Sequence, residues 1–148
     1  MNQRPTEIMR SLMALILADH DVQSAAQTTW GKSLQGYIGI DDDKQPEAAN
    51  MPLLAMRPGS YVPANDRSHR MVTIACALVV NLDGTTGTNP VEMDGLSAIE
   101  LLYQRVETVI ETWADDTYHY QVAWGDSFTE ISFPVYRITW TLTAQENY

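Results

Sequence analysis

Residues 132–144, SFPVYRITWTLTA, alternate between two kinds of side chain, and this pattern constrains the fold more than any other stretch. One set is apolar: Pro134, Tyr136, Ile138, Trp140, Leu142 and Ala144. The other set is mostly polar and mostly β-branched: Val135, Arg137, Thr139, Thr141 and Thr143. Because successive side chains of a strand point to opposite faces of a sheet, the pattern predicts a strand that buries one face and leaves the other mildly polar.

A second long strand is predicted over residues 70–82, RMVTIACALVVNL, where one face is apolar and the other is small and only weakly apolar. Shorter strands are predicted at residues 36–40, 51–62 and 118–124. Two stretches between these strands predict loops: the acidic segment 41–50 and the Gly/Thr/Pro-rich segment 83–95. Long loops in compact domains are often binding segments, so both are candidate contact regions.

Two amphipathic helices are predicted. Residues 5–19 carry a proline suited to a first helical turn and an apolar stripe at helical spacing, formed by Ile8, Leu12, Leu15 and Ile16. Residues 96–114 carry a wider apolar stripe, and either Ser97 or Asp94 is placed to cap this helix. The segment 19–27, DHDVQSAAQ, is expected to end the first helix and enter a loop.

The predicted element order is α-β-β-β-α-β-β within a single domain of residues 1–148. We therefore expect an α+β fold, with a mostly antiparallel sheet and two amphipathic helices packed on one face. The helices would cover the apolar face, which leaves no helix for the other face. Two interpretations of that second face stay open: it is solvated, as antiparallel sheets tolerate, or it contacts another copy of the protein.

The composition restricts the classes of function. The chain has 9 Lys and Arg against 19 Asp and Glu, a net charge of −10. This balance argues against binding DNA or RNA by phosphate neutralisation. No apolar run is long enough for a membrane helix, and no signal peptide is expected. The single cysteine, Cys76, excludes an internal disulfide framework and fits a reducing cytoplasm.

Two acidic clusters are possible metal sites, but each has a simpler interpretation. Residues 19–21, DHD, place an imidazole between two carboxylates, yet further converging ligands would be needed, so we interpret them as a polar helix exit. Asp41, Asp42 and Asp43 are hard-oxygen ligands without the spacing and glycine of a calcium loop, so we interpret them as a solvated loop. We predict no metal and no cofactor.

The stretch WGDSF, residues 124–128, resembles the Gly-Asp-Ser start of some serine esterases. A triad needs a base within reach of Ser127, and no histidine follows it, so we expect a turn between strands and no enzyme. Cys76 is expected to be buried core, and His119 to be a surface or interface residue. Trp30 is expected in a loop, where an indole is suited to anchor a partner.

The element order resembles that of the tail terminator (tail completion) proteins of long-tailed bacteriophages, the lambda type. Three features carry the resemblance: a short N-terminal helix ending in ADHD, an extended segment MPLLAMRPGSYVPANDRSHRMVTIACALVVNL, and a long amphipathic helix followed by closing strands that end in YRITWTLTAQENY. The resemblance spans nearly the whole chain but includes no diagnostic motif, so no family site residue is transferred.

The resemblance implies a structural virion protein at the head-proximal end of the tail, assembled in the bacterial cytoplasm. Such proteins form a homo-hexameric ring on the tail tube, stop its polymerisation and form the joint to the head through a head-completion protein. The acidity would suit a channel through which DNA passes without specific binding. Candidate contacts are the uncovered sheet face with Arg137, Thr139 and Thr141, the loops 41–50 and 83–95, and Trp30.

Three alternatives remain beside the terminator hypothesis. Another head–tail connector subunit would share the fold and the ring. A non-viral binding module would be a monomer or dimer with a solvated sheet. A small hydrolase would depend on Ser127 and would lose its activity when this serine is replaced by alanine.

Overall fold

The computed structural model describes residues 5–39, 51–62, 71–116 and 120–146. It contains the helices α1 (Pro5–Ala18), α2 (His20–Trp30) and α3 (Asp94–Asp116). The strands are β1 (Gln35–Ile38), β2 (Leu53–Val62), β3 (Met71–Asn81), β4 (Thr85–Thr86), β5 (Glu92–Met93), β6 (Tyr120–Trp124), β7 (Phe128–Ser132) and β8 (Val135–Glu146).

The main sheet has six strands in the order β1-β2-β3-β8-β6, with β7 also paired to β8. Every neighbouring pair is antiparallel except β1 and β2, which are parallel. Along β8, β6 pairs with the end near Leu142 and β7 pairs with the beginning, from Val135 to Thr139. The mostly antiparallel α+β fold expected from the sequence is therefore confirmed.

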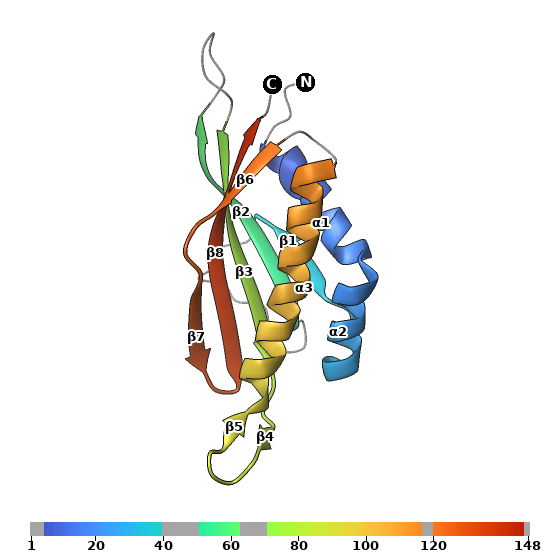
Figure 1. The fold of residues 1–148 in the computed structure, drawn as a ribbon, viewed down its shortest axis with the longest axis vertical. Coiled ribbons are helices and arrows are strands. Elements are labelled where there is room, and N and C mark those ends of the chain that lie inside the picture. Colours follow the sequence, from blue (N-terminus) through green and yellow to red (C-terminus); the bar gives the residue numbers. More distant parts are fainter. Residues whose placement is uncertain (1–4, 40–50, 63–70, 117–119, 147–148) are drawn as a thin grey trace.

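All three described helices lie on one side of the sheet (Figure 1). The sequence predicted two, because the segment after Ala18 was interpreted as a loop. In the structure Asp19 is the N-cap of α2: its Oδ1 accepts a hydrogen bond of 3.0 Å from the backbone N–H of Val22. Gly31 ends this helix with a φ of 66°, a conformation that favours glycine. The prediction of a loop over residues 19–27 was wrong.

The C-terminal strand is also more complex than predicted. The stretch 132–144 is not one continuous strand, because Phe133 and Pro134 form a turn between β7 and β8. The sequence predicted a turn at residues 125–127 followed by the closing strand, whereas Phe128–Ser132 form the separate strand β7. Proline lacks a backbone N–H and suits a turn better than a strand interior, which explains the break.

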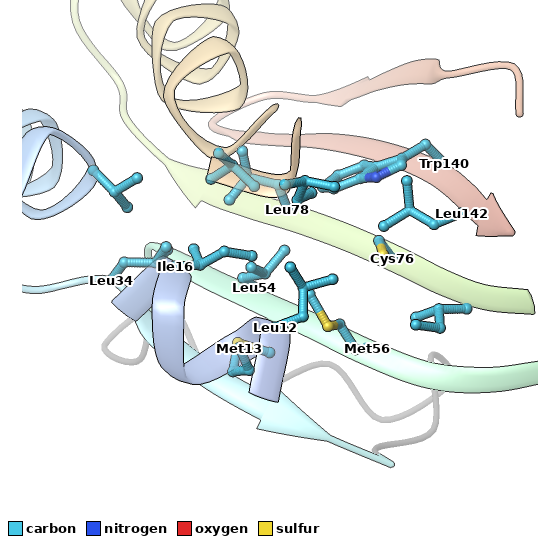
Figure 2. Close-up of a cluster of buried hydrophobic side chains, with 14 of the residues drawn as sticks. Leu12, Met13, Ile16, Leu34, Leu54, Met56, Cys76, Leu78, Trp140 and Leu142 are labelled. Carbon is cyan, nitrogen blue, oxygen red and sulfur yellow. The ribbon is translucent and has the colours of Figure 1, made fainter. Parts of the chain in front are cut away.

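The main core lies between the helices and the near side of the sheet, which we call the helix-side face. Alternate residues of β3 and β8 point into it: Val72, Ile74, Cys76, Leu78, Val80, Tyr136, Ile138, Trp140, Leu142 and Ala144. Figure 2 shows Leu12 and Ile16 of α1 packed toward Leu54 and Met56 of β2. The apolar alternation in the sequence predicted this face of both long strands correctly.

The opposite side of the sheet, which we call the far face, carries a smaller apolar cluster that the sequence did not predict. Met51, Leu53, Ala55, Ala77 and Val79 are buried there, and Tyr37 and Val135 pack against them. Part of the far face is therefore buried, although no described helix packs on it. The reason is that β2 is apolar on both faces, since Leu53 and Ala55 alternate with Leu54 and Met56.

Three smaller predictions are corrected. Leu15 is 41% exposed, and the buried stripe of α1 is formed by Ile8, Met9, Leu12, Met13 and Ile16. Helix α3 begins at Asp94, so Ser97 lies inside the helix and does not cap it. The expected loop 83–95 contains the small β4–β5 hairpin, which extends beyond the main sheet (Figure 1).

None of the described helices is both long and apolar enough to cross a membrane.

Candidate functional site

The far face of the sheet is hollowed by a groove with a volume of about 510 Å³. It crosses three neighbouring strands of the sheet and reaches β7, which lies beyond β8 at the sheet edge (Figure 1). The groove is lined by Ala55, Met56, Arg57, Ala75, Cys76, Ala77, Asp126, Phe128, Glu130, Arg137, Thr139, Trp140 and Thr141. It is the candidate functional site because it is an open concavity built from regular strands.

Small side chains form the floor of the groove. Ala55 of β2 pairs with Ala77 of β3, and Ala75 lies two residues earlier on the same face. Longer side chains line the same groove on either side of these alanines, Arg57 from β2 and Arg137 and Phe128 from β8 and β7. Ala55 and Ala77 also belong to the second apolar cluster, which makes the groove continuous with that cluster.

Four charged residues line the groove. Arg57 lies opposite Ala75 on the far face, and Arg137 of β8 lies opposite Glu130 of β7 in the strand register. Asp126, in the connection between β6 and β7, contributes a second carboxylate. Two cations and two anions in one groove suit a polar protein surface better than a polyanion, because a phosphate backbone requires an excess of positive charge.

Strand β7 forms an exposed apolar edge beside the groove. Phe128 is 63% exposed and Ile131 is 56% exposed, and Phe133 in the following turn is 55% exposed. These are the three most exposed large apolar side chains of the described residues, and they lie within six consecutive positions. Phe128 lies opposite Thr139 and lines the groove, whereas Ile131 lies opposite Tyr136 and belongs to the helix-side face. The β7 edge is therefore apolar on both sides, a kind of exposure that often marks an interaction surface.

Three of the predicted contact residues are brought together by the structure. Arg137, Thr139 and Thr141 lie on the far face of β8 and all line the groove. Their contact role stays a prediction, but their placement on one surface agrees with the alternation from which they were chosen. Asp41, Asp42 and Asp43, and with them the loop 41–50, lie outside the described residues, as does His119.

Trp30 has a different environment from the one predicted. It is the last residue of α2, it packs against the main core, and its indole Nε1 donates a hydrogen bond of 2.9 Å to the carbonyl oxygen of Asn81. Its placement in a loop was therefore wrong. The missed helix accounts for the error, because a tryptophan at the end of a helix can reach the strand layer.

Several groove residues were missed by sequence reasoning. Arg57 belongs to β2, which is apolar on both faces and so shows no simple alternation, and Phe128 and Glu130 belong to β7, which was not predicted. One weak signal for β7 was present: FTEIS contains Phe, Thr and Ile, which are common in strands, directly before a proline-containing turn.

The DHD stretch has a structural role. Asp19 caps α2, and His20 and Asp21 form the first turn of that helix. Within the part of the chain that the structure describes, no group of three or more His, Cys, Asp or Glu side chains is placed to hold a metal ion.

Ser127 lies in the connection between β6 and β7 and interacts with Tyr103 of α3. Burial raises the pKa of the Tyr103 hydroxyl, the charge of Glu107 raises it further, and a side-chain hydrogen bond with Ser127 opposes the shift. The Tyr103 ring also meets the Trp140 ring edge-on, with centroids 4.8 Å apart. Of the three histidines only His20 is described, and it lies in the helix layer.

The glycine of the WGDSF stretch, Gly125, lies close to the backbone of β8. Its backbone N–H donates a hydrogen bond of 2.8 Å to the carbonyl oxygen of Thr141. A side chain at this position would collide with Thr141, so glycine permits the close approach of this connection to β8. The close contact with Thr141 therefore explains why a glycine stands at position 125, and no nucleophilic role of Ser127 is needed to explain it.

Cys76 points into the main core between β3 and the helices (Figure 2). Burial raises the pKa of its thiol well above the usual range. A buried thiol that resists ionisation is a packing group, as the sequence predicted.

Comparisons with known proteins give a distant structural similarity only. No family model matches the sequence, and no curated protein matches it. Among solved structures, the chain is similar to a chain of a structure described as "Virion of native gene transfer agent (GTA) particle". The TM-score is 0.48 and the sequence identity 10%, with 90% of each chain covered. A likeness at this level does not assign a function.

Proposed function

We propose that this protein is a structural subunit of a long-tailed bacteriophage virion that acts as the tail terminator. In this role it forms a homo-hexameric ring on the end of the tail tube, stops tube polymerisation and provides the joint to the head. The observation that carries the proposal is the asymmetry of the domain. One side of the sheet is covered by three helices, and the other side has an open groove beside the exposed apolar strand β7.

This asymmetry supports a ring because ring formation requires two different patches on each subunit. A closed ring is built from heterologous contacts, in which one patch of a subunit meets another patch of its neighbour. The groove with its four charged residues and the apolar edge of β7 differ from the helix layer in shape and chemistry. A two-fold dimer would instead need a single self-complementary patch.

The charge of the chain is compatible with the proposed position in the virion. A ring at the junction of head and tail surrounds a channel through which DNA passes. With a net charge of −10, the subunit would repel the phosphate backbone, so the DNA would move without specific binding. The proposed partners are further copies of the chain, the tail tube protein and a head-completion protein.

We also propose that the protein is not an enzyme. Ser127 is engaged with Tyr103, and Gly125 is explained by its contact with Thr141. The hydrolase alternative is tested by offering short-chain esters to the wild-type protein and to Ser127→Ala. Esterase activity in the wild-type protein that is lost in this variant would contradict the structural role.

The first experiment measures mass in solution by light scattering over a range of protein and magnesium concentrations, followed by imaging of the largest species. A six-fold ring with an open channel is the expected result. A monomer or two-fold dimer under all conditions would favour a non-viral binding module. A closed ring of another size would favour a different head–tail connector subunit.

A matched pair of variants tests whether the groove takes part in assembly. Arg137→Glu reverses a charge inside the groove, and Arg105→Glu makes the same change on the exposed surface of α3. Both variants shift the net charge equally, so a general charge effect would alter both. We expect Arg137→Glu to weaken assembly at least tenfold more than Arg105→Glu. Equal behaviour of the two variants would remove the groove from the proposal.

A further inference from the structure

The two lateral edges of the main sheet are both unpaired in the part of the chain that the structure describes. One edge is formed by β1, which pairs only with β2. The other edge is formed by β7 and β6, which both pair with β8. An edge strand presents a row of backbone N–H and C=O groups, so it is a template for pairing with another chain unless the sequence protects it.

The β7 edge lacks the usual protection. Natural edge strands are guarded by lysines, prolines, bulges or very short length. Strand β7 has five residues, FTEIS, in regular register with β8, and its one charge is Glu130. Every residue of the strand is exposed, including Phe128 and Ile131. This is the pattern of a strand that another strand covers in an assembly.

The β1 edge has matching properties. It has four residues, QGYI, none of them charged, and three of the four are exposed. Ile38 at its end is 36% exposed. In a chain with a net charge of −10, an uncharged edge is a place where two copies can approach without repulsion between carboxylates.

Pairing of β7 with itself is disfavoured. An antiparallel pair of two β7 strands along their full length would be centred on Glu130 and would place this carboxylate opposite its own copy. Like charges directly opposite each other destabilise a pair of strands. A β7–β1 pair places Glu130 opposite an uncharged strand, so charge favours the heterologous pair.

Strand direction favours the same pair. Strands β1, β2 and β8 run in one direction, because β1 is parallel to β2, and both β2 and β8 are antiparallel to β3. Strand β7 is antiparallel to β8 and so runs opposite to β1. When copies stand side by side around an axis along the strands, β7 of one copy meets β1 of the next as an antiparallel pair, the more stable arrangement per residue.

We propose that β7 of one copy pairs with β1 of the next, so that the main sheet continues from subunit to subunit. This inference deepens the proposed function and rests on it. A repeated heterologous contact between strand edges forms a ring only if the rotation from each copy to the next brings the last copy back to the first, and it otherwise forms an open filament. The groove lies beside β7 on the far face, so the joint would place Phe128 and Glu130 at the boundary between two subunits.

Disulfide trapping in the full chain tests the pairing directly. Directly opposite residues of neighbouring strands have Cβ atoms about 4.5–5.5 Å apart, near the separation that a disulfide spans. Gln35→Cys is combined with Glu130→Cys in one variant and with Ser132→Cys in another, to sample two registers. All three positions belong to the far face, because Gln35 lies opposite Leu53, Glu130 opposite Arg137 and Ser132 opposite Val135. Cys76 is buried and stays in all variants. The control combines Arg105→Cys with Ser132→Cys, which places one thiol on α3.

The expected result is a ladder of covalent oligomers from at least one β1/β7 variant under oxidising conditions, reversed by reductant and absent from the control. A second test uses Ile131→Lys, which adds a charge to the β7 edge, with Leu101→Lys on α3 as the matched control. Both wild-type side chains are exposed, 56% and 45%, so neither change removes a core residue. Ile131→Lys is expected to lower assembly at least tenfold more than Leu101→Lys.

The outcomes separate this inference from the proposed function. Wild-type rings with β1/β7 cross-links support both. Wild-type rings without these cross-links, and unaffected by Ile131→Lys, overturn the strand pairing and leave the ring intact. Cross-linked open chains without a closed ring support the pairing and overturn the ring. Absence of both cross-links and assembly overturns both.

Discussion

The helix-side face and the far face of the sheet are built from alternate residues of the same strands, yet they differ in what they bury. On β8, Tyr136, Ile138, Trp140, Leu142 and Ala144 are buried against the helices. Their neighbours Arg137, Thr139 and Thr141 remain partly or largely accessible in the groove. One strand thus buries one set of side chains in the core and leaves the other set at an accessible groove.

The largest expected contrast uses two adjacent residues of β8. Leu142→Ala removes a side chain that is 1% exposed in the main core and should lower the free energy of unfolding by about 3 kcal/mol. Thr141→Ala changes an exposed side chain of the far face and should alter it by less than about 0.5 kcal/mol. Urea denaturation of both variants measures the difference. Similar losses would mean that the far face is sealed as tightly as the helix side.

Two glycines extend the comparison to close approaches. A Cβ on Gly95 would collide with the Tyr136 ring on the helix-side face, and one on Gly125 would collide with the Thr141 hydroxyl on the far face. The buried ring has no room to move, so Gly95→Ala should cost about 2 kcal/mol or more of stability. Gly125→Ala should cost less, because exposed Thr141 can change rotamer. The reverse order in thermal denaturation would contradict this account.

A buried thiol on the helix-side face, Cys76, should make the protein less stable at alkaline pH. Burial raises the pKa of the Cys76 thiol in the folded state above its value of about 8.5 in unfolded chains. The folded protein therefore holds this proton more tightly, and stability is lost as pH rises above the unfolded value, by about 1.4 kcal/mol per pH unit. Burial likewise raises the pKa of Tyr103, which adds to the loss at higher pH.

The measurement is chemical denaturation at several pH values between 7.5 and 10, for the wild-type protein and for Cys76→Ala. The variant should be less stable at neutral pH but should lose less stability as pH rises. Parallel pH profiles for the two proteins would show that the thiol ionises as easily in the folded as in the unfolded state.

The smallest expected effect concerns a polar atom sealed into the core. The Tyr136 hydroxyl is buried, and it has no hydrogen-bond partner among the described residues. An unsatisfied buried hydroxyl destabilises a fold, so Tyr136→Phe should raise the free energy of unfolding by about 1 kcal/mol. Thr139→Val, which removes a hydroxyl from the far face, serves as a comparison and should have a smaller effect. Destabilisation by Tyr136→Phe would reveal a partner for the hydroxyl.

The sequence was most informative where one periodicity held over a long segment. The two long strands and helix α3 were placed within a few residues, because each buries one stripe and exposes another. It was least informative where a short element depended on a cap or a turn. Helix α2 is recognised by the Asp19 cap, and β7 by its pairing with β8, and neither has a long apolar pattern of its own.

The candidate site was predicted only in part for the same reason. Arg137, Thr139 and Thr141 follow from the alternation of one strand. Arg57 and Phe128 lie on two other strands, and only the pairing of β2 with β3 and of β7 with β8 brings them to the same groove. A single sequence shows which face of a strand a residue occupies, but not which strands are neighbours.

The sequence by itself determined the α+β class, the apolar faces of the long strands and helices, the buried thiol and the acidic balance. These follow from local periodicity and composition, which need no knowledge of distant contacts. Only the tertiary structure decided the strand order, the hollow over the alanines and the positions of β1 and β7 at the edges of the described sheet. Those features arise from pairing between segments far apart in the chain, and local side-chain patterns do not encode which segments pair.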